Sequence, residues 1–301
     1  MLPVSRRDWL SAVASALAAV LVPGTVRAVP QDPERRRLDQ WVFALRSEHL
    51  ASPDAPLGMA AARVGRLAAG TPYQPGTLEA YLREGASPRA REPLTLALVH
   101  FDCVTLVESC LAVARTARGE ETPTWERFGH EVERMRYRGG ERGSYATRLH
   151  YFSEWISDGA ARGLVRDVSG ELGGIEDDRP LRFMTEHRAS YPALVDKTVL
   201  AEIAAIERGL DGHARKVVPT DRIASVADRI ETGDVLAFAT AIPGLDVTHA
   251  AFAFRTDDGV LRVLHAPLSG GVVQVTRSTL PEYVAAIHRA TGILVARPLW
   301  G

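Results

Sequence analysis

The chain has 301 residues, of which 46% are hydrophobic and 24% charged, and its formal net charge at pH 7 is −1. This length suits one large domain or two small ones, and the composition is ordinary for a folded soluble protein. Because there is no excess of basic residues, a nucleic-acid partner is not expected.

The first 28 residues have the pattern of an export signal. A short basic stretch, Met1 to Arg7, precedes an uncharged apolar run of 13 residues from Leu10 to Val22. Such a run is too short to span a bilayer comfortably and suits a signal peptide cleaved after Ala28. Because Ser5 to Leu10 resembles a twin-arginine signal, we expect a periplasmic protein with no stable membrane insertion after cleavage. An ordinary secretion signal or a retained anchor is the alternative.

The rest of the chain is expected to be a linker, residues 29–37, and a single domain, residues 38–301. Apolar residues at helical spacing predict helices at Leu38–Leu50, Leu57–Ala69, Val104–Ala114, Pro123–Met135, Leu149–Ala161, Ala193–Arg208 and Thr279–Arg289. Short β-rich runs predict strands at 235–239, 247–254, 260–265, 272–275 and 293–296. The segment from Gly163 to Pro180 is expected to be mostly loop. Helices that precede an antiparallel sheet indicate an α+β fold.

The two cysteines, Cys103 and Cys110, lie seven residues apart. On one helix this spacing separates them by about 10 Å, whereas a disulfide needs Cα atoms within about 7 Å, so both thiols are expected to be free. Cys103 stands where an apolar helix begins, and the free N–H groups and partial positive charge at a helix N-terminus stabilise a thiolate. Cys103 is therefore a candidate nucleophile. The alternative, a buried structural cysteine, suits Cys110.

Two histidines are predicted to lie on neighbouring strands. His249 opens one apolar strand and His265 ends the next, with the turn sequence Asp257-Asp258-Gly259 between them. A loop with an odd number of residues would place both side chains on one face of the sheet, about 5–8 Å apart. One imidazole could then accept a thiol proton while the other orients it. An even loop would separate them, and two unrelated strand histidines remain the alternative.

The familiar metal and nucleotide motifs are missing from the sequence. Zinc sites need three or four ligands, and no C-x-x-C, H-x-x-x-H or H-E-x-x-H spacing occurs. There is also no G-x-S-x-G, Walker or G-x-G-x-x-G motif. No metal and no cofactor are therefore expected.

Several motifs in order resemble the N-acetylmuramoyl-L-alanine amidase-like branch of the NlpC-type papain-like cysteine hydrolases, over roughly residues 38–298. They are Gly70–Tyr73, Phe101–Glu108, Arg136–Gly140, Tyr145–Phe152 with Trp155, Phe183-Met184 with His187, Gly233–Phe238, Gly244–His249, Leu264–Ala266, and Gly292-Ile293 with Arg297-Pro298. The chain departs from the usual pattern at Ala250-Ala251 and Pro267-Leu268, which could alter the wall of the pocket.

The resemblance implies a papain-like core with extra N-terminal and inserted helices. It implies Cys103 as nucleophile, His249 as general base and His265 as the residue that orients His249. The implied reaction is hydrolysis of the amide between N-acetylmuramic acid and L-alanine, with muropeptide or peptidoglycan fragments as partners and a preference for anhydro-muropeptides. Five residues are candidates for substrate binding: Tyr73, Asp102, Arg148, Tyr151 and Asp246.

Two other functions remain open at this point. One is an endopeptidase that cuts γ-D-glutamyl-diaminopimelate bonds on the same fold, and the motifs between Arg136 and Trp155 favour the amidase over it. The other is a non-catalytic module that binds peptidoglycan, which the joint presence of Cys103, His249 and His265 disfavours.

Overall fold

A computed structural model describes residues 32–119, 121–268 and 271–301. The expected signal, residues 1–28, lies outside these described residues, and Pro33 to Gly301 form one unit. The first helix, α1 (Pro33–Ser47), begins inside the stretch 29–37 that was expected to be a linker. Proline suits the first position of a helix and Glu34 lies in the favourable first turn, so this basic segment can start a helix directly.

Helices α2 (Leu57–Leu67), α4 (Cys103–Ala117) and α5 (Trp125–Arg136) confirm the helices expected in the first half of the chain. The next expected helix starts three residues late, as α6 (Phe152–Ala161). The cause is hydrogen bonding just before it, because the Leu149 N–H donates to the Arg136 carbonyl at 2.9 Å. The Ser153 N–H in the first turn of α6 donates to the Asp246 carboxylate at 2.8 Å.

The remaining helices are shorter, apart from α8. The helix expected at 193–208 is a 3-10 turn, Pro192–Val195, followed by α8 (Lys197–Gly209), whose first turn is capped by the Asp196 side chain. The other α-helices are α3 (Ala80–Arg83), α7 (Phe183–Glu186), α9 (Ile223–Val226) and α10 (Leu280–Ala286). No helix in the described part of the chain is long and apolar enough to cross a membrane.

Eight strands in the described residues form one sheet in which every pair is antiparallel, which confirms the α+β class. The order is β2-β3-β8-β4-β5-β6-β7, and β1 also pairs with β8. The strands are β1 (Val165–Asp167), β2 (Ile175–Asp177), β3 (Arg215–Pro219), β4 (Val235–Thr240), β5 (Val247–Arg255), β6 (Leu261–His265), β7 (Gln274–Val275) and β8 (Ala290–Pro298). The segment 163–180 was expected to be loop, and its strands β1 and β2 are three-residue, mostly exposed pieces without an apolar pattern.

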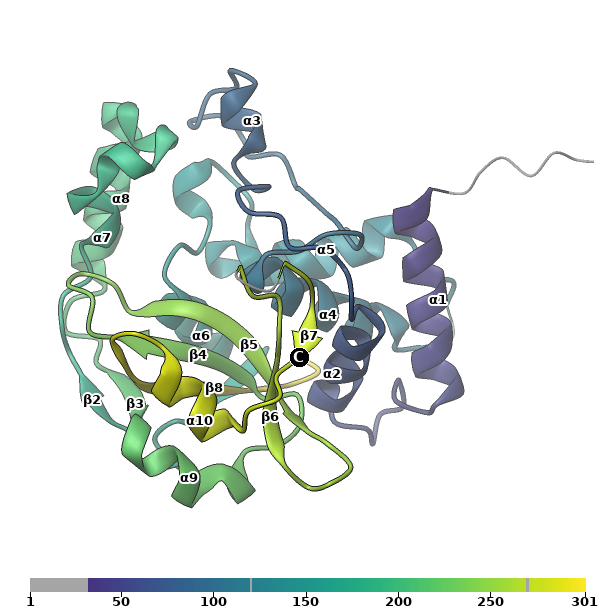
Figure 1. Ribbon diagram of the computed structural model, residues 1–301. Helices are drawn as coiled ribbons and strands as arrows, with labels where there is room; N and C mark the ends of the chain where they lie inside the picture. The colour runs from purple at the N-terminus through teal and green to yellow at the C-terminus, as the bar shows by residue number, and fades with distance from the viewer. Residues whose placement is uncertain (1–31, 120, 269–270) are drawn as a thin grey trace, which may run out of the picture. The chain divides into compact units, whose positions relative to one another are not determined.

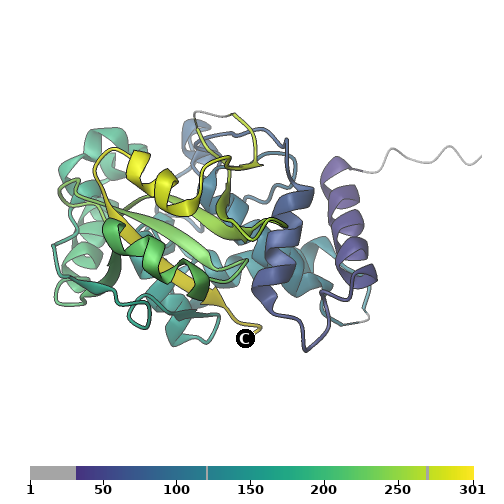
Figure 2. The same ribbon diagram turned by 60° about the horizontal axis from the view of Figure 1, so that its bottom comes forward.

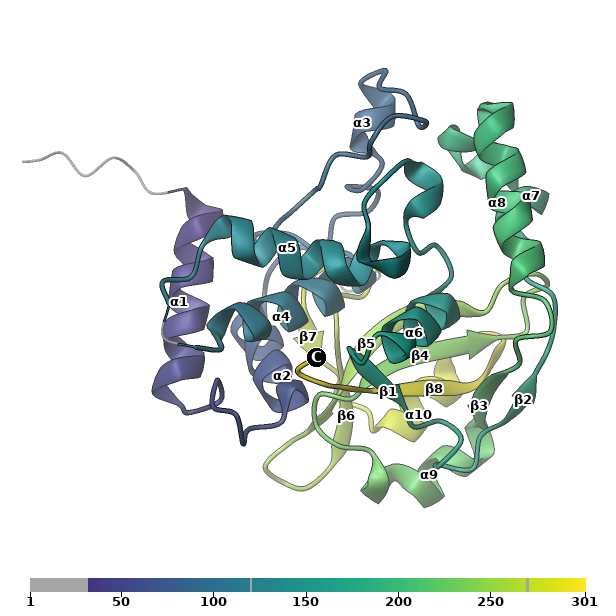
Figure 3. The ribbon, with the colours of Figure 1, turned by 180° about the vertical axis from the view of Figure 1, so that it is seen from behind.

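The two faces of the sheet belong to different hydrophobic cores. Because side chains alternate along a strand, Val235 and Ala237 of β4 face a core shared with α1, α2, α4, α5 and α6. Leu236 and Phe238 face the opposite way, into a core closed by α9 and α10. Figure 1 and Figure 3 show α10 and α9 on one side of the sheet and α4 and α6 on the other. The view in Figure 2 shows α10 lying across the strands.

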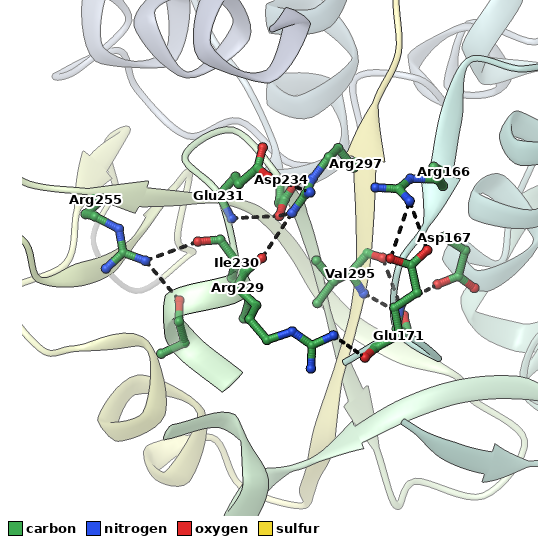
Figure 4. Close-up of polar contacts among 12 residues, drawn as sticks. Arg166, Asp167, Glu171, Arg229, Ile230, Glu231, Asp234, Arg255, Val295 and Arg297 are labelled. Carbon is green, nitrogen blue, oxygen red and sulfur yellow. Dashed lines mark hydrogen bonds and ion pairs between the residues drawn. The ribbon is translucent and has the colours of Figure 1, made fainter. Parts of the chain in front are cut away.

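The beginning of β4 is fixed by a close approach between two glycines and by an ion pair. Gly233 has φ +90°, and a Cβ there would lie 1.9 Å from the carbonyl oxygen of Gly58 in α2. The next residue, Asp234, is buried and accepts two hydrogen bonds of 2.9 Å from Arg297 on β8 (Figure 4). The Asp234 side chain also accepts the Glu231 N–H at 2.8 Å. These contacts hold the central strands against the helical layer.

Candidate functional site

Cys103 is the first residue of α4, where a capping box fixes the helix start. The Asp102 carboxylate accepts the Thr105 N–H at 2.7 Å, and the Thr105 hydroxyl accepts the Asp102 N–H at 2.9 Å. Reciprocal caps of this kind satisfy two of the unpaired N–H groups of a helix start. Asp102, expected to bind substrate, therefore has a structural role at the side of the candidate nucleophile. Both cysteines are free thiols, with Cys103 partly exposed and Cys110 buried.

The electrostatics of Cys103 differ from the expectation of a stabilised thiolate. Burial, followed by the negative charge of Asp102, raises the pKa of the Cys103 thiol to about 11. The backbone N–H groups of Ala250, Val104 and Cys103 itself act in the opposite direction and lower this pKa only in part. The helix N-terminus thus acts in the expected direction but is outweighed, and the thiol carries its proton at neutral pH. The contact with Ala250 also places the sulfur beside the strand residue that follows His249.

His249 and His265 come together on one face of the sheet, as their spacing predicted. Strand β5 pairs with β6 up to Arg255 opposite Leu261, which leaves an odd, five-residue loop, 256–260. One residue beyond the pair Phe252–Leu264, His265 lies opposite residue 251, which is two residues from His249 on the same face of the sheet. Nε2 of His249 lies 2.9 Å from Nδ1 of His265, and the ring centroids are 5.2 Å apart. An extra residue in β5, Thr248, forms a bulge directly before His249, a device that often re-aims a side chain at a functional site.

Both imidazoles are neutral in this environment. Burial lowers the pKa of His249 to about 4, and burial together with the charge of a protonated His249 lowers the pKa of His265 to about 3. The His249 ring also stacks on Phe238, with centroids 5.6 Å apart and planes 12° from parallel. Because Nε2 of His249 faces His265, its Nδ1 is the nitrogen left to accept a proton. A neutral, oriented imidazole of this kind can serve as a general base.

Tyr73 lies in a short extended segment beside Cys103. Tyr73 forms an isolated β-bridge with Phe101, which lies two residues before the cysteine, and the Gln74 N–H donates to the Phe101 carbonyl at 2.9 Å. On its other side, the Tyr73 N–H donates to the Gly271 carbonyl at 2.8 Å. Burial and the nearby charges of Cys103 and Asp102, when ionised, raise the pKa of Tyr73. The structure therefore places this candidate substrate-binding residue at the rim of the site.

The other candidate substrate-binding residues are buried and already hydrogen-bonded. Arg148, 9% exposed, pairs with Glu92 at 3.1 Å and Glu79 at 3.2 Å. The hydroxyl of Tyr151 donates to Glu207 at 2.7 Å. Asp246, 1% exposed, accepts hydrogen bonds from the backbone of Ser153 and Val247 and so caps α6 rather than facing solvent.

The surroundings of Arg148 and Tyr151 follow from the late start of α6. Arg148 and Tyr151 were expected on one helix with Trp155, but they precede α6, and Tyr151 is its N-cap residue. The extended stretch before the helix pairs Arg148 with Tyr137. It turns the two side chains inward, toward acidic partners that are distant in the sequence.

A cavity of about 210 Å³ borders the start of α4. Its walls come from six separate segments of the chain: Leu78 and Glu79; Asp102, Val104 and Glu108; Arg136; Arg148, Leu149, His150 and Tyr151; Phe183, Met184 and Tyr191; and Leu245. The pair Arg136–Glu108 at its base is buried, with Nε and Oε2 2.7 Å apart. Sequence reasoning listed both residues within motifs but did not predict that they pair.

A larger cavity, about 800 Å³, lies elsewhere. Phe254 and Arg262 line it, about 17 Å along β5 from His249 at 3.3 Å per residue. No cluster of three or more His, Cys, Asp or Glu side chains that could hold a metal occurs within residues 32–119, 121–268 and 271–301. Asp102, the residue before Cys103, lines the smaller cavity, and the two histidines lie on β5 and β6.

Several solved structures share the fold, and some of them are named as N-acetylmuramoyl-L-alanine amidases. A crystal structure of an N-acetylmuramoyl-L-alanine amidase from Bacteroides uniformis is 29% identical, with a TM-score of 0.73, and covers 81% of this chain and 99% of its own. A Bacteroides fragilis structure described as a xylanase candidate is 31% identical, with a TM-score of 0.70, and the match covers 78% of this chain and 98% of the Bacteroides fragilis chain. A Legionella pneumophila protein that is 18% identical shares the fold, with a TM-score of 0.64, and the match covers 88% of this chain and 94% of the Legionella chain.

No curated protein matches the chain. A family model described as N-acetylmuramoyl-L-alanine amidase-like matches residues 63–293, which is most of the sequence. The resemblance expected from the motifs is thereby confirmed, and the chain belongs to the AmiA-like family of N-acetylmuramoyl-L-alanine amidase-like proteins.

Proposed function

We propose that this amidase-like protein is a cysteine amidase that hydrolyses the bond between N-acetylmuramic acid and L-alanine in muropeptides. In this proposal Cys103 is the nucleophile, His249 the general base and His265 the residue that orients His249. The observation that carries the proposal is a chain of contacts. The backbone of Ala250 is near enough to lower the pKa of the Cys103 thiol, its neighbour His249 lies on the same strand, and Nε2 of His249 lies 2.9 Å from Nδ1 of His265.

The raised pKa of Cys103 and the lowered pKa of His249 favour a neutral resting pair. Proton transfer then accompanies attack. The thiol proton moves to Nδ1 of His249 while the sulfur bonds to the carbonyl carbon of the muramic acid lactyl group. Unpaired N–H groups in the first turn of α4 supply donors for the oxyanion.

Collapse of this tetrahedral species breaks the C–N bond, and His249 gives its proton to the departing amine of L-alanine. The lactyl group remains on Cys103 as a thioester. His249 then takes a proton from water, whose oxygen attacks the thioester carbonyl. The C–S bond breaks, releasing the muramic acid carboxylate, and the thiol regains its proton.

The 210 Å³ cavity beside Asp102 is the proposed place for the part of the substrate next to the scissile amide. Buried charges of both signs surround it, since Arg148 and Arg136 are each balanced by glutamates. Such a wall offers hydrogen-bond donors and acceptors to a polar peptide. A preference for anhydro-muropeptides is part of the proposal and rests on the resemblance alone.

The test uses purified disaccharide-anhydro-tetrapeptide, with products identified by mass spectrometry. The mature protein should release intact tetrapeptide and free disaccharide, and Cys103→Ala should release neither. Cys110→Ala is the matched control, because Cys110 is a buried thiol in the same helix and should leave the products unchanged. Circular dichroism establishes that each variant is folded.

Other products would identify other functions. A cut within the peptide would move the assignment to the γ-D-glutamyl-diaminopimelate endopeptidase, and a cut within the glycan would indicate a glycosidase. Binding to peptidoglycan without any product would favour the non-catalytic module. Each of these outcomes contradicts the amidase proposal.

We also propose that the protein acts in the periplasm after export by the twin-arginine route. The support is the signal pattern in residues 1–28. Cell fractionation with N-terminal sequencing should find mature protein beginning at Val29. Replacing Arg6 and Arg7 by lysine should retain the precursor in the cytoplasm, and continued export of that variant would contradict the route.

A further inference from the structure

Tyr283 of α10 contacts the two-histidine array, although no sequence motif included it. Its hydroxyl lies 3.1 Å from Nδ1 of His265, the same nitrogen that lies 2.9 Å from His249. The rings of Tyr283 and His265 are perpendicular, with centroids 5.1 Å apart, and Tyr283 also packs on Phe238 at 5.4 Å. One ring nitrogen of His265 thus has two polar neighbours.

A neutral imidazole nitrogen either carries a proton or offers one lone pair, so this arrangement has two forms. In the first, Nδ1 of His265 is unprotonated and accepts from the Nε2–H of His249 and the hydroxyl of Tyr283. In the second, Nδ1 of His265 carries the proton and donates to Nε2 of His249 or to the hydroxyl oxygen. The choice also fixes where the proton sits on His249.

Only the first form can perform the proposed reaction. With Nε2–H directed at His265, neutral His249 has a free lone pair on Nδ1 and can take the thiol proton. In the second form Nε2 of His249 is the acceptor, so its proton sits on Nδ1 and blocks that step. The hydrogen bond of one ring nitrogen sets the state of the other, as in catalytic triads.

We propose that Tyr283 is a positioning residue whose hydroxyl donates to Nδ1 of His265 and thereby selects the tautomer in which His249 can act as a base. This inference rests on the proposed function of Cys103 and His249. A phenol donates a hydrogen bond only while protonated, and burial, then the charge of a Cys103 thiolate, raises the pKa of Tyr283 to about 12. The hydroxyl therefore keeps its proton through the range in which an amidase works.

The position of Tyr283 is held by its own helix. Thr279 and Glu282 form a capping box at the start of α10. Leu280 and Val284 are fully buried in the core on this face of the sheet. Because α10 is fixed in this way, Tyr283→Phe should keep the ring in place and remove only the hydroxyl.

The experiment compares wild type with Tyr283→Phe by two measurements. Long-range proton–nitrogen correlation spectra of nitrogen-15-labelled protein report the tautomer of each histidine ring, with His265 and His249 assigned from single variants. Steady-state kinetics on the disaccharide-anhydro-peptide report kcat and KM. Tyr81→Phe is the matched control, since the Tyr81 hydroxyl is buried without a hydrogen-bond partner in the described residues and lies in α3.

In Tyr283→Phe, we expect the spectra to show a larger share of the Nδ1-protonated form of His265. One neutral hydrogen bond shifts an equilibrium by about five- to tenfold, so kcat should fall measurably, by at most about that factor, while KM stays within about twofold. Tyr81→Phe should match wild type in both measurements.

Unchanged histidine spectra in Tyr283→Phe would overturn the inference, whether or not kcat falls, because Tyr283 would then act by another route. An unchanged kcat in an active enzyme would overturn it as well. If wild type releases no amidase product, the proposed function fails, but the spectra still decide whether Tyr283 controls the tautomer. The two failures are therefore distinguishable.

Discussion

Replacing Asp102 by asparagine should separate two effects that this residue combines, the helix cap and the charge beside the thiol. Asparagine keeps an oxygen that can accept the Thr105 N–H, now bonded at 2.7 Å, so the stability of α4 should change little. The substitution removes the negative charge that helps to raise the pKa of Cys103. Asp102→Ala removes both and should lower the free energy of unfolding by about 1 kcal/mol.

The size of the charge effect can be estimated. At an effective dielectric constant of about 40, between the values used for a protein surface and for water, two unit charges about 6–8 Å apart interact by roughly 1–1.4 kcal/mol, which is about one pKa unit. With a pKa of about 11, one Cys103 thiol in about a thousand is ionised at pH 8. Asp102→Asn should raise this share about tenfold.

The assay is the rate of iodoacetamide alkylation of Cys103 between pH 6 and pH 11, followed by peptide mass spectrometry. Cys110 serves as an internal reference, because burial raises its pKa and no charge change occurs beside it. An alkylation profile of Cys103 that does not shift in Asp102→Asn would refute the electrostatic argument. Equal destabilisation by asparagine and alanine would refute the capping argument.

Three further predictions concern stability. Gly233→Ala should lower the free energy of unfolding in urea by at least about 3 kcal/mol, because the cost of the left-handed backbone adds to the overlap of the new Cβ with the facing helix. Gly85→Ala has the same backbone cost but open space around the Cβ, so it should lower the free energy of unfolding by about 1–2 kcal/mol. The folded-state pKa values of His249 and His265, about 4 and 3, lie below the ordinary 6.5, so their neutral forms stabilise the fold above pH 6.5 and this contribution is lost as pH falls toward 4 and 3. The free energy of unfolding should therefore be about 2–3 kcal/mol lower at pH 4.5 than at pH 7 through the contribution of His249 alone. A free energy of unfolding that does not change with pH would contradict the burial argument. Arg136→Met should lower the free energy of unfolding by about 3–5 kcal/mol, because its glutamate partner would stay buried without a counter-charge, and a loss below about 1 kcal/mol would show that this carboxylate is readily solvated or protonated.

The sequence predicted those parts of the site that depend on local pattern. The even spacing of His249 and His265 predicted a shared sheet face on the condition of an odd loop, and the five-residue loop 256–260 meets that condition. The α4 helix followed from its apolar run, and the order of the motifs identified the family. Each of these inferences depends only on residues that are close in the sequence or that belong to one hairpin.

The parts that could not be predicted depend on partners distant in the sequence. Arg148 forms ion pairs with Glu79 and Glu92, and the spacing of apolar residues along the sequence cannot predict such pairs. The pKa of Cys103 is raised because burial outweighs the helix N-terminus, which requires the packed structure. Tyr283 contacts His265 only because α10 lies across the sheet, and its sequence resembles an ordinary amphipathic helix.

The location of the site has a consequence for how the protein gains activity. The helix that carries Cys103 belongs to the first half of the chain, while β5 and β6, which carry the histidines, belong to the second. Contacts of such long sequence separation form late and slowly in folding. A nascent or unfolded chain therefore holds a protonated thiol without its base. The proposed reactive centre would be completed only when the sheet closes, so a chain that has not yet folded would not hydrolyse amide bonds.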